Sequence, residues 1–150
     1  MKIDALLDTN VVIAMLVEAH EHHAPSLALL GNEDIRYAVA AHSYAEAYAT
    51  LTRLGPHGPF QFTAAEAWSA LESVRAVTAL VGLTAPQSLA AVRAYAQQGG
   101  IGARLYDRLI GESAVAHDIP AIVTWNVRHM RGLFPGLSVQ RPDERGNAVR

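Results

Sequence analysis

Apolar and polar positions along the chain follow two alternating patterns. Short apolar runs bounded by polar or turn-forming residues are typical of buried strands, and they occur at residues 3–7, 37–40, 77–83, 119–124 and 137–139. Stretches with apolar residues three or four positions apart predict helices, at residues 11–17, 25–30, 43–54, 63–74, 86–98 and 103–117. Strands that alternate with helices in this way predict an α/β domain with a mostly parallel central sheet.

The length of the chain and the absence of a long linker indicate a single domain. A chain of 150 residues can bury about two-thirds of its unfolded surface without disulfide bonds. The Gly/Pro segment at residues 55–59 is too short for an interdomain linker, and the sequence contains no internal repeat. We therefore expect a single domain over residues 1–140, followed by a polar tail at residues 141–150 that we expect to be loose.

Composition excludes several classes of site and of protein. The sequence contains no cysteine, which removes disulfide frameworks, thiolate zinc sites and cysteine nucleophiles, and fits a reducing compartment. Its apolar runs fall short of the roughly 20 residues that a membrane-spanning helix needs. Asp4 and Asp8 interrupt the N-terminal apolar segment, so we expect no signal peptide. A cytoplasmic protein is the expectation.

The charges are unevenly distributed, although the net charge of −2 is close to neutral. Residues 1–100 carry 5 basic and 9 acidic side chains, whereas residues 101–150 carry 7 and 5. Lys2 is the only lysine among the 12 basic residues. Arginine suits bidentate contacts with phosphate, although on these facts alone a GC-rich genome explains an arginine-rich, alanine-rich composition better. The arginines near the candidate site are Arg104, Arg108, Arg128 and Arg131.

Four polar residues are predicted at one edge of the sheet. Ligands of open parallel sheets bind beyond the carboxyl ends of the strands. Asp8 follows the first predicted strand, and Asn126 follows the strand that ends at Thr124. Glu46 and Asp107 lie near the starts of predicted helices, and the start of a helix lies at the same edge as the end of the strand before it. We therefore expect these side chains to meet.

Each of these residues also has a purely structural explanation. Asp8 can cap the helix that follows it through an Asx turn. Glu46 stands three residues after Ser43, which is the spacing of a capping box. Asp107 can interact favourably with the helix dipole or pair with Arg104 or Arg108, and Asn126 can be an ordinary turn residue. Taken singly, each of these explanations stays open.

Together, the three carboxylates indicate a metal site. Carboxylates gathered at one sheet edge repel one another strongly at low dielectric, and a divalent cation relieves that repulsion. Mg²⁺ and Mn²⁺ prefer oxygen ligands and are commonly held by a few carboxylates together with a substrate phosphate. Such a site suits phosphodiester hydrolysis, because the metal lowers the pKa of a bound water and neutralises charge on the leaving oxygen.

Four segments of the sequence resemble the motifs of the PIN-domain nucleases, in the family's order and across nearly the whole chain. They supply in turn a strand that ends in an aspartate, a glutamate at a helix start, an aspartate on a later helix and a Thr-x-Asn turn after a strand. These segments are Leu6-Leu7-Asp8-Thr9-Asn10-Val11-Val12-Ile13, Ser43-Tyr44-Ala45-Glu46, Tyr106-Asp107-Arg108-Leu109-Ile110-Gly111-Glu112-Ser113-Ala114 and Thr124-Trp125-Asn126-Val127-Arg128-His129-Met130.

The length and motif order are similar to those of the VapC toxins of toxin–antitoxin pairs. The resemblance implies a three-layer α/β/α fold, Mg²⁺- or Mn²⁺-dependent endonucleolytic cleavage of RNA, often tRNA or rRNA, inhibition by a cognate antitoxin protein, and a homodimer. It implies that Asp8, Glu46 and Asp107 are the metal-binding carboxylates, with Asn126 as a fourth catalytic residue. The candidate substrate-binding residues are Thr9, Arg104, Thr124 and Arg128.

The fourth motif departs from the family pattern. Many relatives carry a further acidic residue in or just after it, whereas here Asn126 is neutral and the residue three positions later is His129. We therefore expect one tightly bound ion, with any second ion arriving with the phosphate. His129 is either a surface histidine or a residue that contacts substrate or assists proton transfer.

Two further groups of residues have competing explanations. The cluster His20, His22 and His23 superficially suggests zinc, but it lacks the i, i+4 spacing that places two ligands on one helix face. Trp68 and Trp125 can stack on bases or, as is more common, pack in the interior.

Two other functions compete with the nuclease. A phosphotransferring hydrolase of the haloacid-dehalogenase type also begins with an aspartate after its first strand. It needs a second aspartate where this chain has Asn10, and a later lysine that this chain lacks, so we reject it. A non-catalytic PIN-like module that binds RNA or a protein stays as the alternative, because Asn126 is neutral.

Overall fold

The centre of the molecule is a five-stranded parallel sheet. The computed structural model describes residues 2–56 and 58–147. In space the strands follow the order β3-β2-β1-β4-β5, and each neighbouring pair is parallel. The strands are β1 Ala5–Leu7, β2 Tyr37–Ala40, β3 Ala79–Val81, β4 Ala121–Val123 and β5 Ser138–Gln140. The prediction of an α/β domain with a mostly parallel sheet is therefore confirmed.

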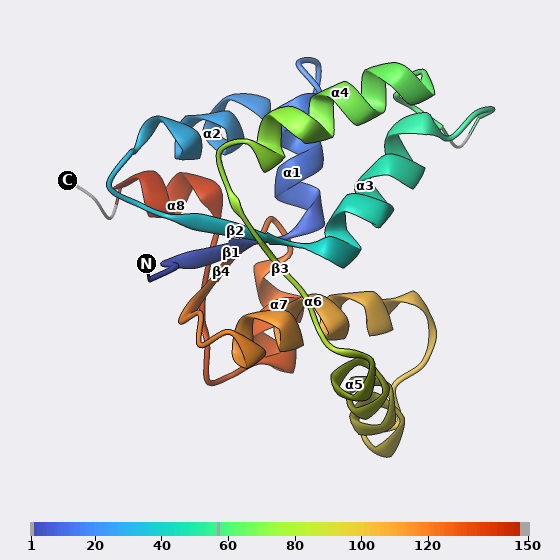
Figure 1. Ribbon diagram of the computed structural model, residues 1–150, viewed down its shortest axis with the longest axis vertical. Coiled ribbons are helices and arrows are strands. Elements are labelled where there is room, and N and C mark those ends of the chain that lie inside the picture. The colour runs from blue at the N-terminus through green and yellow to red at the C-terminus, as the bar shows by residue number, and fades with distance from the viewer. Residues whose placement is uncertain (1, 57, 148–150) are drawn as a thin grey trace.

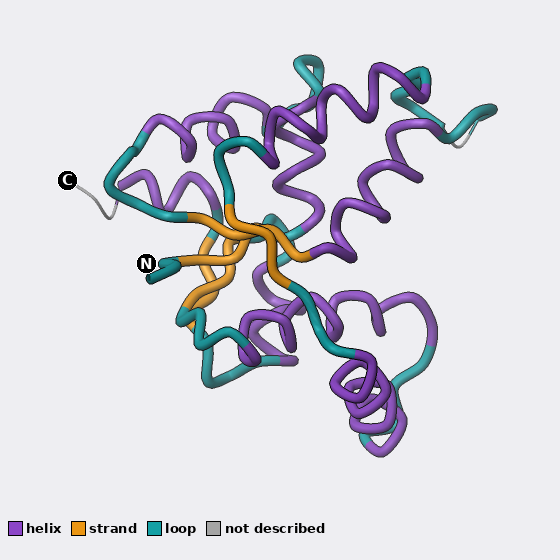
Figure 2. Tube along the Cα trace, viewed as in Figure 1, coloured by secondary structure: helices purple, strands orange, loops and turns teal. Residues whose placement is uncertain are grey.

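Helices cover both faces of this sheet, which gives the expected three layers. In Figure 1, α1, α2, α3, α4 and α8 lie above the sheet, and α5, α6 and α7 lie below it. Figure 2 shows the strands as a narrow central layer between them. The helices are α1 Thr9–Leu16, α2 His23–Ala28, α3 Ala41–Thr52, α4 Ala64–Arg75, α5 Ala85–Gln97, α6 Leu105–Ala116, α7 Val127–Leu133 and α8 Pro142–Asn147, with 3-10 turns at Leu29–Gly31 and Gly102–Arg104.

The core consists of two main apolar clusters, one on each face of the sheet. Successive side chains of a strand point to opposite faces, so Ala5 and Leu7 enter one cluster and Leu6 enters the other. The first cluster includes Val12 of α1, and the second includes Ile110 of α6. Because these strands are covered on both faces, they are continuously apolar rather than alternating, as the sequence pattern required.

Three details differ from the sequence-based expectation. Helices α7 and α8 were not predicted, because each is short and rich in charged residues. Helix α3 begins at Ala41 rather than at Ser43. The segment expected to be a loose tail contains α8, which packs against α2 with Pro142 buried, while residues 148–150 lie outside the described residues. The domain boundary at residue 140 stays a prediction.

None of the helices in the described part of the chain combines the length and the apolar character that a membrane crossing requires.

Gly111 allows two elements below the sheet to make close contact. It lies in α6, and the ring of Phe134, which follows α7, packs directly against its Cα. A Cβ at this position would overlap the ring carbons of Phe134. The ring is buried, so it has little room to move away. This contact fixes α7, and with it the loop before α7, against the helix that carries Asp107.

We expect Gly111→Ala to destabilise the fold by about 1–3 kcal/mol, because the added methyl overpacks the contact with Phe134. The matched control is Gly132→Ala in α7, where a Cβ would meet no atom within 4 Å. At that position alanine should be neutral or stabilising by up to about 1 kcal/mol, owing to its higher helix propensity. Urea unfolding measures both variants, and equal effects of the two would contradict the role given to Gly111.

Candidate active site

Asp8 lies at the centre of the carboxyl edge of the sheet, where β1 and β4 end side by side. Its backbone N–H donates to the carbonyl oxygen of Val123 at 2.9 Å. Its side chain is only 3% exposed. One carboxylate oxygen accepts from the N–H of Thr9 at 2.8 Å, and the other accepts from the hydroxyl of Thr124 at 2.8 Å. Helix capping therefore accounts for one oxygen, and a tertiary contact with Thr124 for the other.

Thr124 connects Asp8 to the fourth motif. Its hydroxyl oxygen also accepts from the side-chain amide of Asn10 at 3.1 Å and from the backbone N–H of Asn126 at 3.0 Å. The amide oxygen of Asn10 in turn accepts from the N–H of Trp125 at 3.0 Å. The sequence reasoning assigned no role to Asn10, although an asparagine two residues after the aspartate was the signal that could have revealed it.

Glu46 approaches the same edge from α3. Because α3 begins at Ala41 and Ala40 makes no side-chain cap, the capping-box explanation for Glu46 is wrong. Ser43 is instead fully buried and accepts from the hydroxyl of Thr9 at 2.9 Å, while Glu46 Oε1 lies 3.3 Å from that hydroxyl. Thr9 therefore links the helix after β1 to the helix after β2. The buried role of Ser43 was missed from sequence.

Asp107 lies in the first turn of α6, where its charge suits the helix dipole. Its carboxylate meets the imidazole of His129 from α7, with Nε2 and Oδ2 3.1 Å apart. Arg108 pairs with Glu112 at 3.0 Å instead. The pairing of Asp107 with Arg108 is therefore wrong, whereas Arg104, the other predicted partner, lowers the pKa of Asp107 through its charge. The contact with His129 was not predicted.

The three carboxylates influence one another electrostatically. The pKa of Asp8 is raised from 3.8 to about 6, mainly by burial and also by the charges of Asp107 and Glu46, against the hydrogen bonds from Thr124 and Thr9. Burial and the charge of Asp107 also raise the pKa of Glu46. Burial raises the pKa of Asp107, which His129 and Arg104 oppose. The structure therefore brings the three predicted carboxylates into one electrostatic cluster.

The donor set of this cluster fits a hard divalent cation, because it is made of carboxylate oxygens whose mutual repulsion a cation would relieve. In their present positions, no three His, Cys, Asp or Glu side chains of residues 2–56 and 58–147 are arranged to hold a metal ion. Each carboxylate engages a protein partner instead: Thr124 for Asp8, Thr9 for Glu46 and His129 for Asp107. A carboxylate accepts several bonds, so these contacts leave acceptor capacity on each group.

A pocket of about 460 Å³ adjoins this cluster. Its lining includes Asn126 and His129 from the fourth motif, together with Arg104 and Arg128. Asn126 is exposed, and its side chain does not cap α7. The structure therefore places both predicted arginines in a cavity next to the carboxylates, whereas Thr9 and Thr124 are buried beneath them.

The histidines at residues 20–23 do not converge as a zinc site would require. The ring of His22 stacks on Trp125, with centroids 3.8 Å apart and an interplanar angle of 10°. His20 Nδ1 accepts from the backbone N–H of His22, and His23 Nδ1 lies 2.9 Å from the carbonyl oxygen of Ala14. Trp125 is half-buried in this stack, whereas Trp68 is 56% exposed.

The sequence matches the model of the PIN domain over residues 5–131, which takes in all four motifs. The chain belongs to the PIN-domain family. Comparison with curated proteins gives no significant match. The elements that follow residue 131, β5 and α8, extend this PIN domain beyond the matched segment.

Solved structures share the fold of this PIN domain at low sequence identity. VapC20 of Mycobacterium tuberculosis, described as a sarcin–ricin loop cleaving toxin, has a TM-score of 0.64 and 15% identity, with 79% of this chain and 87% of that chain covered. VapBC2 of Rickettsia felis bound to promoter DNA has a TM-score of 0.65 and 18% identity, with 93% of this chain and 98% of that chain covered. DNA-bound VapBC of Salmonella typhimurium has a TM-score of 0.65 and 17% identity, with 94% of this chain and 99% of that chain covered. The recognised family and its three-layer fold are thus confirmed, whereas the roles of individual residues stay predictions.

Ionised Asp8 should weaken the metal-free fold. Its pKa in the folded protein, about 6, exceeds the ordinary 3.8, so the folded state binds the proton more tightly and stability falls as pH rises between these values. In EDTA, we expect Asp8→Asn to gain about 1–3 kcal/mol of stability relative to the wild type between pH 4 and pH 7.5. Urea unfolding across this range measures the difference, and a constant difference would contradict the assignment.

Proposed function

We propose that this PIN domain is a metal-dependent endoribonuclease that hydrolyses phosphodiester bonds of RNA. The observation that carries the proposal is the juxtaposition of three mutually repelling carboxylates with an arginine-lined pocket at one edge of the sheet. The carboxylates suit a divalent cation and the arginines suit phosphate. A phosphodiester chain is a substrate that can use both the divalent cation and the arginines.

In this proposal Asp8, Glu46 and Asp107 would hold Mg²⁺ or Mn²⁺. The ion would supply a water of lowered pKa and neutralise negative charge on the phosphate. The protein groups beneath the carboxylates fix their orientation. Thr124 holds one oxygen of Asp8, and Thr9 contacts Glu46, so both carboxylates are preorganised from below the surface.

The two arginines would bind and position the RNA. Both Arg104 and Arg128 are exposed, and both line the pocket beside Asp107 and His129. Guanidinium groups bind phosphate with two parallel hydrogen bonds, which orients the backbone as well as attracting it. Asn126, exposed at the rim of the same pocket, would add a neutral donor to the reacting phosphate or the ribose.

We further propose that the protein is the toxin of a toxin–antitoxin pair, acts on tRNA or rRNA, forms a homodimer and is inhibited by a cognate antitoxin. The support is its similarity to VapC20, described as a sarcin–ricin loop cleaving toxin, and to the VapBC structures. A small reading frame directly upstream that encodes a DNA-binding antitoxin would support this role. Absence of such a frame would favour RNA maturation instead.

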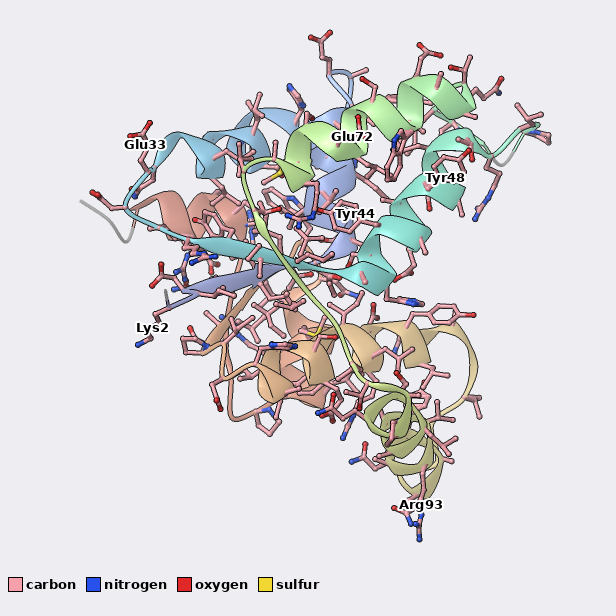
Figure 3. The ribbon with its side chains drawn as sticks, in the orientation of Figure 1. Lys2, Glu33, Tyr44, Tyr48, Glu72 and Arg93 are labelled. Atoms are coloured by element: carbon pink, nitrogen blue, oxygen red, sulfur yellow. The ribbon has the colours of Figure 1, made fainter. Side chains whose placement is uncertain are left out.

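We expect the purified protein, freed of any co-purifying partner, to cleave structured RNA only with Mg²⁺ or Mn²⁺. Asp8→Asn should reduce the rate about a thousandfold or more, since a lost metal ligand removes several kcal/mol of transition-state stabilisation. The matched control is Glu33→Gln, an exposed carboxylate before β2 at the opposite edge (Figure 3), which should keep full activity. Cleavage that survives EDTA or Asp8→Asn would contradict the proposal. RNA binding without any cleavage would favour the non-catalytic module.

The arginine pocket can be tested apart from catalysis. In an Asp8→Asn background, we expect Arg128→Ala and Arg104→Ala each to weaken RNA binding. Each should also make the dependence of log K on log salt concentration shallower by about 0.7 to 0.9, because one phosphate contact is lost. Arg93→Ala is the control: this arginine lies at the far end of α5 and points away from the sheet (Figure 3). An equal effect of all three substitutions would contradict a localised phosphate site.

A further inference from the structure

His129 faces the carboxylate cluster with an unusual contact. Its Nε2 atom is buried and lies 3.1 Å from Oδ2 of Asp107, and the side chain is only 16% exposed. At that distance an imidazole N–H normally donates a hydrogen bond to a carboxylate. Here the two groups are close enough for an ion pair, but the orientation of the ring does not align Nε2 for a hydrogen bond. A buried ring nitrogen and a carboxylate oxygen from two different helices therefore lie in close contact without a well-aligned hydrogen bond between them.

The spacing of these two atoms suits a shared cation. Two neighbouring ligand atoms of an octahedral ion with bonds of about 2.1 Å lie about 3.0 Å apart, close to the 3.1 Å between His129 Nε2 and Asp107 Oδ2. The two residues come from different helices, α7 and α6, so local helix geometry does not impose their approach. The contact between Gly111 and Phe134 holds these helices together.

His42 provides an internal comparison. Its Nε2 lies 3.4 Å from Glu46 Oε1 and also has no hydrogen-bond partner. These two residues are four positions apart on α3, where helix geometry alone brings side chains together. The His42 side chain is 34% exposed, and its ring lies against Tyr106. Helix spacing and ring packing explain His42, whereas neither explains His129.

His129 also lies between the two halves of the site. It contacts Asp107 of the carboxylate cluster and lines the pocket that contains Arg104 and Arg128. A cation beside Asp107 at this position would therefore also be next to a phosphate held by the arginines. Asn126, the other residue of the fourth motif at this pocket, is neutral. It therefore cannot act as a fourth carboxylate ligand of the cation.

We propose that His129 is a nitrogen ligand of the divalent cation, shared with Asp107. The proposal rests on the proposed function for the presence of a cation at this edge. An imidazole ligand would change the metal preference of the site, relative to a site made of carboxylates alone. Imidazole nitrogen is a good ligand for first-row transition ions, whereas Mg²⁺ prefers oxygen. The site should therefore favour Mn²⁺, and more strongly the later transition ions, over Mg²⁺.

The decisive measurement is pulsed EPR of the RNA-free protein loaded with Mn²⁺ alone. We expect nitrogen hyperfine coupling to the Mn²⁺ spectrum in the wild type and its loss in His129→Ala. His129→Gln, which keeps a polar side chain of similar length, is the second variant if the alanine variant folds poorly. Calorimetric titrations with Mn²⁺ and Mg²⁺ accompany the spectra. Loss of the imidazole should lower the ratio of Mn²⁺ to Mg²⁺ affinity by about tenfold or more.

The control variants separate ligation from mere positioning. His117→Ala removes an exposed imidazole whose Nε2 lies 2.9 Å from the carbonyl oxygen of Gly82, and should leave coupling and affinities unchanged. Nitrogen coupling that survives in the His129 variants, or that disappears only in His42→Ala, overturns the proposal. A wild-type spectrum without nitrogen coupling, or failure of the wild type to bind Mn²⁺, also overturns the proposal. An equal loss of Mn²⁺ and Mg²⁺ affinity in the His129 variants overturns it as well. Mg²⁺-dependent cleavage that requires Asp8 would stand despite any of these results, so the two proposals can fail separately.

Discussion

The hydrogen bond from Thr124 to Asp8 joins two strand ends that are 116 residues apart in the sequence. It depends on the sheet order, in which β1 lies between β2 and β4. That order places residues 8, 41 and 124 at one edge and brings α1, α3 and the loop before α7 together. Buried polar groups are stable only when they are hydrogen-bonded. Asp8, Thr9, Ser43 and Thr124 satisfy one another there, so the fold and the site share the same contacts.

The positions of the strands could be predicted because each is a short apolar run covered on both faces. Every predicted strand overlaps an observed one, and the helices up to α6 were found to within a few residues. Helices α7 and α8 were missed because charged and polar residues dominate them, and their stability comes from tertiary contacts such as Phe134 against Gly111. The start of α3 was misplaced because Ser43 has the residue type of a helix cap, although it is buried inside the first turn.

The carboxylates of the site could be predicted because each follows a strand or lies within the first two turns of a helix at the same edge. The side chains that contact these carboxylates could not be predicted. Whether Asp107 meets Arg108 or His129 depends on how α7 packs against α6, and no local pattern in the sequence specifies that packing. The same is true of Asn10, whose side chain reaches Thr124 and the backbone of Trp125 across the edge. Local sequence therefore identifies which groups carry charge, and the tertiary structure decides which groups compensate it.

That compensation is incomplete around Asp8, and its incompleteness has a physical consequence. The groups seen to bond its carboxylate are a hydroxyl and a backbone amide, which orient the charge without neutralising it. The arginines lie at the exposed rim of the neighbouring pocket. A guanidinium paired directly with Asp8 would have lowered its pKa and stabilised the metal-free protein, but it would also have competed with any cation. Leaving the charge uncompensated costs folding stability in the metal-free protein. That cost is recovered when an ion binds the folded state, so cation affinity and fold stability are thermodynamically linked.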